Sequence, residues 1–301
     1  MIKENKPVTF LNQPYLGNRE NARAMVSLTG ICVNSSYEDR GVETGPDAVR
    51  RVSLRYANGD GSSQPIKIYN PERGFILDGV TIEDTGNIIT GSDPEITERL
   101  IENEIRKLLY AGSFPLSIGG DHYVTFPIVS AYEGPITVVQ LDAHGDYLPL
   151  NCGFPHGYVM RRVSNLPQVR RVIHCGLRGN MNTGPGLDDS VRNGNVIITS
   201  GDLRRGGIQI LLKEFDRNER VYVTGDVDIL DPSIAPAVGV PEPGGMEYEF
   251  LRELLCSLPE KVDVRGLDFT EYNPELDINN ITGVHVANLI FEFLSSRFKK
   301  K

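Results

Sequence analysis

Residues 136–146 read ITVVQLDAHGD, and this stretch decides the fold class. Its first part, Ile136–Leu141, is rich in β-branched and apolar residues, as in a parallel strand that is buried on both faces. If the strand continues, the alternating side chains of Asp142, His144 and Asp146 share one face. Because open parallel sheets bind ligands beyond the carboxyl ends of their strands, this stretch predicts a central strand that leads into a functional site.

Strand-like and helix-like segments alternate along the whole chain. The expected strands are Ala24–Val33, Phe114–Ile118, Ile136–Leu141, Val169–Gly176, Val196–Thr199, Arg220–Gly225 and Val262–Phe269. The expected helices are Pro94–Ala111, Ile208–Phe215, Tyr248–Ser257 and Ile281–Phe298. This alternation predicts an α/β fold in which helices cover both faces of a mostly parallel sheet. Since the sequence has neither an internal repeat nor an obvious linker, we expect one domain over residues 1–301.

Composition excludes several classes of protein. Hydrophobic residues make up 40% of the 301 residues and charged residues 24%, which is ordinary for a globular chain. The formal charge of −9 argues against a nucleic-acid backbone or an anionic membrane as the main partner. No apolar run approaches the ~20 residues of a membrane span, and the N-terminus contains no signal core, so we expect a cytoplasmic protein. The four scattered cysteines indicate neither a disulfide framework nor a zinc ribbon.

Two further clusters of polar residues follow predicted strands. One is the segment SIGGDH at residues 117–122, in which two glycines permit a tight turn after the strand. The other is the segment DVDILDP at residues 226–232. Asp226 and Asp228 would share a face of the strand, and two carboxylates so close repel one another unless a cation or a proton intervenes.

Apart from Asp121 and Asp231, the clusters together supply two histidines and four aspartates that can bind metal. This set is too large for a single catalytic zinc, which takes about three protein ligands. It fits two divalent ions that share carboxylates roughly 3.5–4 Å apart. The oxygen-rich donors favour manganese, and nickel, cobalt and iron are also compatible with them. Because two dications make a bound water much more acidic, the site composition predicts hydrolysis.

At these residues the sequence resembles the ureohydrolase family, which includes arginase and agmatinase. The matching segments are GGDH at 119–122, DAHGD at 142–146 and DVDILDPSIAP at 226–236, continued by PEPGG at 241–245. The resemblance extends from about residue 41 to residue 274. It implies a three-layer α/β/α fold with a mostly parallel central sheet, as in arginases and deacetylases. It also implies hydrolysis of a guanidino C–N bond and assembly as a homo-oligomer, a trimer or a hexamer.

The resemblance implies two Mn²⁺ ions per chain. Carried over residue by residue, the first ion is held by His122, Asp142, Asp146 and Asp226. The second is held by Asp142, His144, Asp226 and Asp228. Asp142 and Asp226 would then bridge the two ions.

The resemblance also implies three catalytic residues. The segment NCGFPHG at 151–157 resembles the substrate loop of the family, with Asn151 as a substrate contact and His156 as a proton shuttle, since histidine exchanges protons near neutral pH. The segment DFTEYNP at 268–274 provides Glu271, whose carboxylate matches a planar guanidinium. Asp146 would pass a proton to the leaving nitrogen. The plainer alternatives are a surface position for His156 and a structural ion pair for Glu271.

Three positions depart from the family pattern. Val238 and Val240 stand where many relatives have threonines, and Gly153 replaces an acidic residue of agmatinase-like loops. The loop also lacks the Ser-Gly-Asn run of arginase, so we expect a small agmatine-like guanidino compound as the substrate, with urea and an amine as the products. The alternatives are another guanidino, formimino or amidino substrate, or a catalytically silent subunit. The complete ligand set argues against the silent subunit.

Two histidines outside these motifs have plainer interpretations. His174 lies in the apolar run VIHCG and is expected to be a satisfied core or sheet-edge residue. His285 lies in the last predicted helix, where a structural role is favoured over a place in the pocket.

Overall fold

A central parallel sheet organises the chain in the computed structural model, which describes residues 7–35, 40–57, 66–91, 93–153 and 155–299. Within these residues the sheet has eight strands in the order β4-β1-β5-β10-β9-β6-β7-β8, and every neighbouring pair is parallel. Its strands are β1 (Val26–Ile31), β4 (Ile82–Ile88), β5 (Phe114–Gly119), β6 (Ile136–Leu141), β7 (Val169–Leu177), β8 (Val196–Thr199), β9 (Arg220–Asp226) and β10 (Asp263–Thr270). A separate antiparallel hairpin pairs β2 (Ile68–Asn70) with β3 (Gly74–Ile76).

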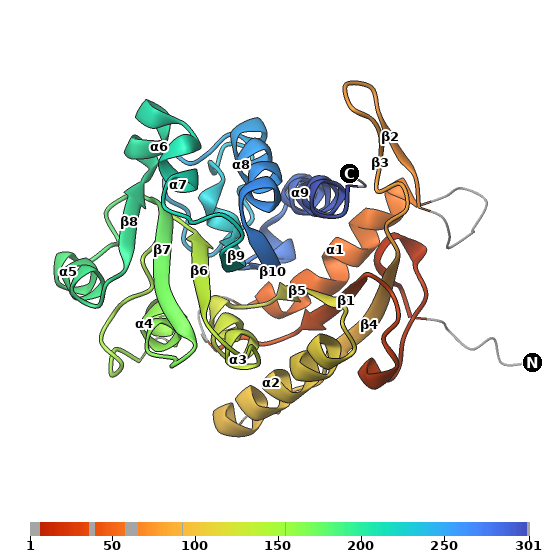
Figure 1. Ribbon diagram of the computed structural model, residues 1–301, viewed down its shortest axis with the longest axis horizontal. Coiled ribbons are helices and arrows are strands. Elements are labelled where there is room, and N and C mark those ends of the chain that lie inside the picture. The colour runs from red at the N-terminus through yellow and green to blue at the C-terminus, as the bar shows by residue number, and fades with distance from the viewer. Residues whose placement is uncertain (1–6, 36–39, 58–65, 92, 154, 300–301) are drawn as a thin grey trace, which may run out of the picture.

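Helices cover both faces of this sheet. They are α1 (Gly45–Ser53), α2 (Pro94–Tyr110), α3 (Thr125–Ser130), α4 (Val159–Ser164), α5 (Gly184–Arg192), α6 (Ser200–Gly206), α7 (Gln209–Leu212), α8 (Tyr248–Lys261) and α9 (Ile281–Arg297). Helices α1, α8 and α9 lie on one face, and α2, α3 and α4 lie on the other (Figure 1). The predicted three-layer α/β/α architecture with a mostly parallel sheet is therefore confirmed.

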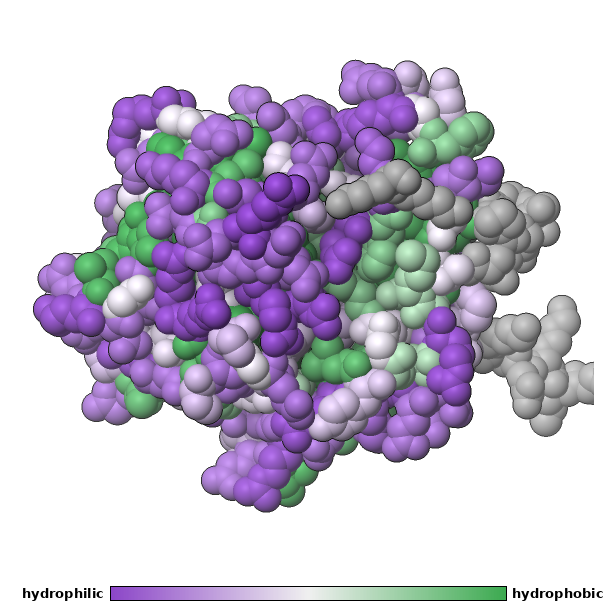
Figure 2. Space-filling model, viewed as in Figure 1, coloured by the Kyte–Doolittle hydropathy of each residue, from purple (hydrophilic) through white to green (hydrophobic). Residues whose placement is uncertain are grey.

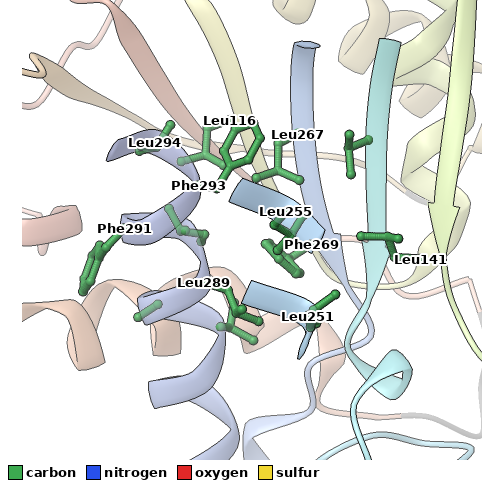
Figure 3. Close-up of a cluster of buried hydrophobic side chains, with 14 of the residues drawn as sticks. Leu116, Leu141, Leu251, Leu255, Leu267, Phe269, Leu289, Phe291, Phe293 and Leu294 are labelled. Carbon is green, nitrogen blue, oxygen red and sulfur yellow. The ribbon is translucent and has the colours of Figure 1, made fainter. Parts of the chain in front are cut away.

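Two apolar layers hold the sheet between the helices. Every residue of β1, β5 and β6 is buried, as continuous apolar strands require. On one face, leucine and phenylalanine side chains of α8 and α9 pack against β5, β6 and β10 (Figure 3). This packing anchors the strands whose carboxyl ends carry the candidate site.

The expected elements differ from the structure in several bounds, and helices α3, α4, α5 and α6 were not predicted. Strands β6 and β8 have the predicted bounds, whereas α7 is shorter than Ile208–Phe215 and α8 runs past Ser257 to Lys261. Strand β4 was not predicted, because its sequence IEDTGNI has no clear apolar alternation. The strand pairs with β1, and the charge of its buried Asp84 is compensated by Arg50 at 2.8 Å.

Figure 2 shows hydrophilic residues over most of one face, with apolar residues in smaller groups between them. In the described part of the chain, no helix combines the length and the apolar character needed to cross a bilayer.

Candidate metal centre and active site

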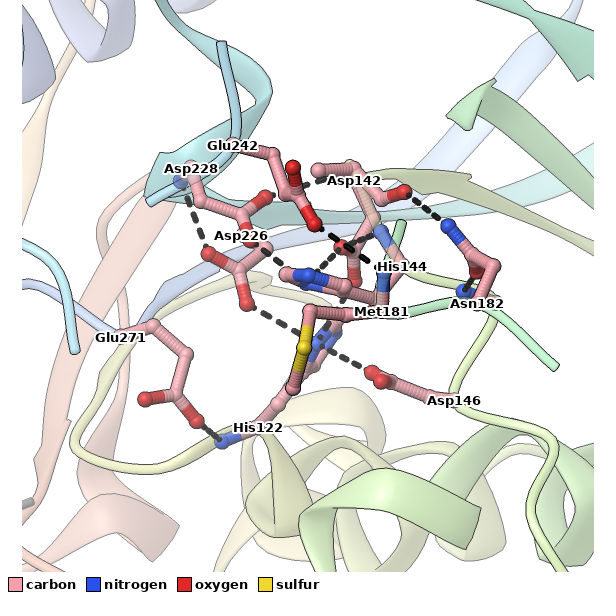
Figure 4. A network of polar contacts seen from close by, with 12 residues as sticks. His122, Asp142, His144, Asp146, Met181, Asn182, Asp226, Asp228, Glu242 and Glu271 are labelled. Carbon is pink, nitrogen blue, oxygen red and sulfur yellow. Dashed lines mark hydrogen bonds and ion pairs between the residues drawn. The ribbon is translucent and has the colours of Figure 1, made fainter. Parts of the chain in front are cut away.

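The candidate site lies where four adjacent strands end at the centre of the sheet. These strands are β5, β10, β9 and β6, and each is followed by at least one predicted site residue. The residues are His122 after β5, Glu271 after β10, Asp226 and Asp228 at the end of β9, and Asp142, His144 and Asp146 after β6. The structure brings the six predicted metal ligands together, with Glu271 beside them (Figure 4).

The side chains of Asp142, His144 and Asp146 are brought together by a turn after β6. They do not alternate along a continued strand. The strand ends at Leu141, and Asp146 has a positive φ of 47°. The expectation that the strand continues and places alternating side chains on one face was therefore wrong. Instead, the backbone N–H of His144 donates to Asp142 Oδ1 at 2.6 Å, so the chain folds around the carboxylate.

The segment at the end of β9 also turns. A 3-10 helix, Val227–Ile229, follows the strand directly and is capped by Asp226, which accepts a hydrogen bond from the N–H of Asp228 at 2.8 Å. Asp228 in turn accepts from the N–H of Ala143 at 2.9 Å. Each carboxylate thus has one oxygen held by backbone, which leaves the other oxygen to face the cluster.

Two overlapping groups of donor atoms have spacings that fit metal binding. Nδ1 of His122 lies 3.1 Å from Asp142 Oδ2, 3.0 Å from Asp146 Oδ2 and 3.5 Å from Asp226 Oδ2. Adjacent ligands of an octahedral ion, each about 2.1 Å from it, stand about 3.0 Å apart. Nδ1 of His144 lies 2.8 Å from Asp228 Oδ2 and 3.6 Å from Asp142 Oδ1. Asp142 belongs to both groups, as a bridging ligand must.

The negative charges of the clustered aspartates also favour binding of cations. Burial, and then the charges of neighbouring aspartates, raise the pKa of Asp142 well above its ordinary value. The same two causes raise the pKa of Asp226 to about 6. Burial acts to lower the pKa of His122, but its carboxylate neighbours outweigh burial and raise it. Without a cation, these groups therefore compete for protons at neutral pH, and two divalent ions would remove that competition.

A buried hydrogen-bond chain fixes the His122 imidazole from behind. Its Nε2 lies 2.9 Å from the Thr224 hydroxyl, which donates to Asp268 at 2.6 Å. Asp268 also accepts from Tyr222 at 2.6 Å and from Thr125 at 3.1 Å. Because the Thr224 proton goes to Asp268, His122 Nε2 is the donor, and the Nδ1 lone pair is left for a metal.

Sequence reasoning missed the contribution of Gln140. Its Nε2 donates to Asp142 Oδ2 at 2.7 Å and to Asp146 Oδ2 at 3.3 Å, while its Oε1 lies 2.5 Å from Nδ1 of His174. His174 is buried and hydrogen-bonded, which confirms the core role expected for it, but the link to the site was not foreseen. The available signal was a glutamine inside an otherwise apolar strand, since such a side chain needs polar partners.

Glu271 is held in a strained conformation at the acidic floor of the pocket. Its backbone φ is +63°, and its N–H donates to the carbonyl of Gly120 at 2.7 Å. The side-chain Oε1 accepts the N–H of His122 at 2.6 Å. Burial, and then the charges of Asp121 and Asp226, raise the pKa of Glu271 well above its ordinary value. Strain of this kind concentrates at functional sites, where neighbouring contacts maintain it.

The remaining predicted residues occupy different places. His156 lines the pocket, and its Nδ1 lies 3.6 Å from the buried carboxylate of Asp121. Asn151 is exposed and is absent from the described pocket lining. Phe154, in the predicted substrate loop, lies outside the described residues. His285 bonds to a backbone carbonyl of its own helix and does not belong to the described lining.

Apolar side chains form the outer wall of the pocket, which has a volume of about 140 Å³. They are Tyr147, Leu148, Met181, Leu187, Val238 and Val240. None of the residues that line the described part of the pocket is a lysine or an arginine. The pocket is therefore acidic at its floor and apolar at its wall.

Comparison with known proteins identifies the family. Residues 24–295 match the model of the arginase family. The chain belongs to the arginase family. It is therefore a hydrolase that acts on C–N bonds of linear amidines, as the resemblance predicted.

Individual relatives of this arginase-family chain carry several activities in their names. Guanidinopropionase of Pseudomonas aeruginosa is 31% identical, over 95% of this chain and 90% of its own. An agmatinase of Enterobacter is 29% identical, over 98% and 92%. The solved structure of proclavaminate amidino hydrolase from Streptomyces clavuligerus has a TM-score of 0.84 at 28% identity and covers 97% of each chain.

The buried His174 should make folding stability depend on pH. Burial lowers its pKa to about 4, below the ordinary 6.5, so the unfolded chain binds the proton more readily. Stability is therefore lost as pH falls below 6.5, by about 2 kcal/mol from this group at pH 5 relative to pH 7.5. Urea unfolding of His174→Asn should show a smaller acid loss than wild type, whereas His285→Asn should keep the wild-type dependence. An unchanged acid loss in His174→Asn would contradict this assignment.

Proposed function

We propose that this protein is a dimanganese hydrolase that cleaves the guanidino C–N bond of a small agmatine-like compound and releases urea and an amine. The observation that carries the proposal is the convergence of two overlapping His/Asp groups and Glu271 in one pocket. Membership of the arginase family supports the reaction class. The single domain, the trimer or hexamer and the cytoplasmic location stay predictions.

The metal ligands in this proposal are the six residues of the two overlapping groups. His122, Asp142, Asp146 and Asp226 would hold one ion, and Asp142, His144, Asp226 and Asp228 the other. Four carboxylates would balance the charge of two dications. When bound, such a pair lowers the pKa of a water shared between the ions and so supplies hydroxide near neutral pH. The oxygen-rich donor set favours Mn²⁺, and Ni²⁺, Co²⁺ and Fe²⁺ also fit it.

Three side chains would bind and move protons during the reaction. The Glu271 carboxylate is suited to orient a guanidinium through two charge-assisted hydrogen bonds. Asp146 lines the same pocket and can carry a proton toward the leaving nitrogen. His156, supported by the buried Asp121, can exchange protons between the pocket and solvent. Asn151 is retained from the family resemblance as a contact to the outer part of the substrate.

The pocket wall favours a substrate tail without negative charge. A tail carboxylate would lie against apolar side chains and near an acidic floor, with no lysine or arginine among the described lining residues. A desolvated carboxylate without a partner is costly, whereas an alkyl chain gains from the apolar wall. An alkylamine tail, as in agmatine, is therefore favoured over the acid tail in the name of guanidinopropionase.

Val238 and Val240 support an alternative substrate group. Both line the pocket and neither side chain can form a hydrogen bond. A formimino or other amidino group presents fewer hydrogen-bonding groups than a guanidinium and would need fewer partners. The products separate these substrates, since a guanidino compound releases urea and a formimino compound releases formamide.

Replacement of Asp142 should abolish binding of both ions, because this residue belongs to both donor groups. We expect Asp142→Ala to retain well under one Mn²⁺ per chain where wild type retains two, as measured by elemental analysis after loading and gel filtration. The exposed Asp216 provides the control, and Asp216→Ala should keep the wild-type content. Two tightly bound ions in Asp142→Ala would refute the bridging assignment.

Replacement of Glu271 by glutamine should separate substrate binding from metal binding. The amide carbonyl can still accept the N–H of His122, so the local fold and the Mn²⁺ content should persist. Loss of the charged pair to the guanidinium should reduce kcat/KM about 10²-fold. Steady-state urea release by the Mn²⁺-loaded variant measures this effect, and unchanged kinetics would remove Glu271 from its role.

A substrate panel tests the proposed function as a whole. Mn²⁺-loaded protein is assayed with agmatine, butylguanidine, 4-guanidinobutanoate and a formimino amino acid, with urea, ammonia and formamide as readouts. We expect urea from agmatine and at least tenfold lower kcat/KM for the acid of equal chain length. Preference for the acid would overturn the tail argument. No turnover by protein that holds two ions per chain would instead support a silent subunit.

A further inference from the structure

A row of buried polar side chains crosses the sheet directly beneath the candidate metal site. Gln140 of β6 is the register partner of His174 on β7 and of Thr224 on β9. Thr224 is in turn the partner of Asp268 on β10. All four side chains are fully buried, in strands that are otherwise mainly apolar. Thr224 and Asp268 form one half of the row and support His122. Gln140 and His174 form the other half.

The hydrogen-bond donors and acceptors of Gln140 and His174 follow from their partners. Gln140 Nε2 lies 3.1 Å from the carbonyl oxygen of His144, which can only accept, so the amide N–H groups must face the site. Gln140 Oε1 therefore faces His174, whose Nδ1 must carry the proton. His174 Nε2 must then accept from the hydroxyl of Ser190, 2.7 Å away. Asn195 donates to that hydroxyl oxygen at 3.0 Å.

The Gln140 amide acts on one side of the metal site. Its contacts are to Asp142 Oδ2 and Asp146 Oδ2, the two oxygen atoms that lie 3.1 and 3.0 Å from His122 Nδ1. The other group is formed by Asp142 Oδ1, His144 and Asp228 Oδ2. Within the described part of the chain, the Gln140 side chain forms no hydrogen bond with Asp228. Any change in the orientation of Gln140 should therefore affect the His122 side first.

We propose that His174 is a positioning residue for the metal centre, which locks the Gln140 carboxamide so that its N–H groups orient the oxygens of Asp142 and Asp146 toward His122. This inference rests on the proposed metal site. If the amide turned over, its oxygen would face the His144 carbonyl and two carboxylates, all of which repel it. The Nδ1–H of His174 opposes that rotation, because a turned amide would present N–H to N–H.

The surroundings of His174 keep it in the required form. Burial lowers its pKa to about 4, so the imidazole is neutral near pH 7. The edge of the Tyr147 ring packs against it, with ring centroids 6.0 Å apart. Partners that orient metal ligands from behind typically change metal affinity 10- to 100-fold when removed. The structure therefore gives His174 the features of such a partner, acting through one intervening side chain.

The test measures Mn²⁺ binding by the full chain after removal of metal with a chelator. Calorimetric titration resolves the two binding steps, and electron paramagnetic resonance distinguishes a single ion from a coupled pair. We expect His174→Phe to weaken one step about tenfold and leave the other within threefold, so that single-ion spectra appear at intermediate Mn²⁺. His174→Asn places an N–H near the original Nδ1 position and should recover most of the affinity.

A double-variant cycle separates positioning from general packing. Gln140→Leu should weaken the same step, and adding His174→Phe to it should change affinity less than twofold, because the histidine acts through the glutamine. Val172→Ala is the matched packing control. Val172 is buried on the same face of β7, and its truncation should lower the unfolding midpoint without changing either Mn²⁺ step.

Several results would overturn the inference. They are unchanged affinity in His174→Phe, equal weakening of both steps, full additivity with Gln140→Leu, and failure of His174→Asn to recover affinity over His174→Phe. If wild type itself does not bind a pair of ions, the proposed function fails as well. If wild type binds two ions and only the His174 effects are missing, this inference fails alone.

Discussion

The mutual repulsion of buried carboxylates at the centre of the sheet is the constraint on which the site depends. Asp142, Asp146, Asp226 and Asp228 lie together at low exposure, where their charges are poorly screened. Protein groups compensate only part of this charge, through backbone N–H donors and two imidazoles. A pair of divalent ions is the simplest complement, and its chemistry agrees with the hydrolysis of C–N bonds by the arginase family.

Parallel strands in register supply the support that this arrangement needs. The same layer of residues beneath the site contributes Gln140, His174, Thr224 and Asp268 from four adjacent strands. Thr224 hydrogen-bonds to Asp268 and Gln140 hydrogen-bonds to His174, so none of the four side chains is buried without a polar partner. The two inner members, Thr224 and Gln140, contact the predicted ligands above the row, and the outer members Asp268 and His174 hold them in place. The apolar layers on both faces of the sheet exclude solvent from this row and hold the strands in place.

Substrate selection depends on a different part of the pocket. Its floor holds the carboxylates and Glu271, whereas its wall is formed by apolar side chains such as Leu148, Met181 and Val238. The strained backbone at Asp146 and Glu271 directs two acidic side chains into the same space. The residues suited to the reaction therefore differ from those suited to select the tail of the substrate. This agrees with a family whose members carry the names of several different guanidino and amidino substrates.

The α/β class, the central strands and the six clustered His and Asp residues could be predicted from the sequence, because continuous apolar runs and dense acidic motifs are local patterns. The way in which these residues converge could not be predicted, since the turns after β6 and β9 depend on backbone N–H groups that donate to the carboxylates of Asp142 and Asp226. The contact between Gln140 and His174 could be seen only in the folded protein, because the two residues are 34 positions apart in the chain and meet through strand register. Pairing across a parallel sheet joins residues without any local signal, so such partners emerge only when the strands are assembled.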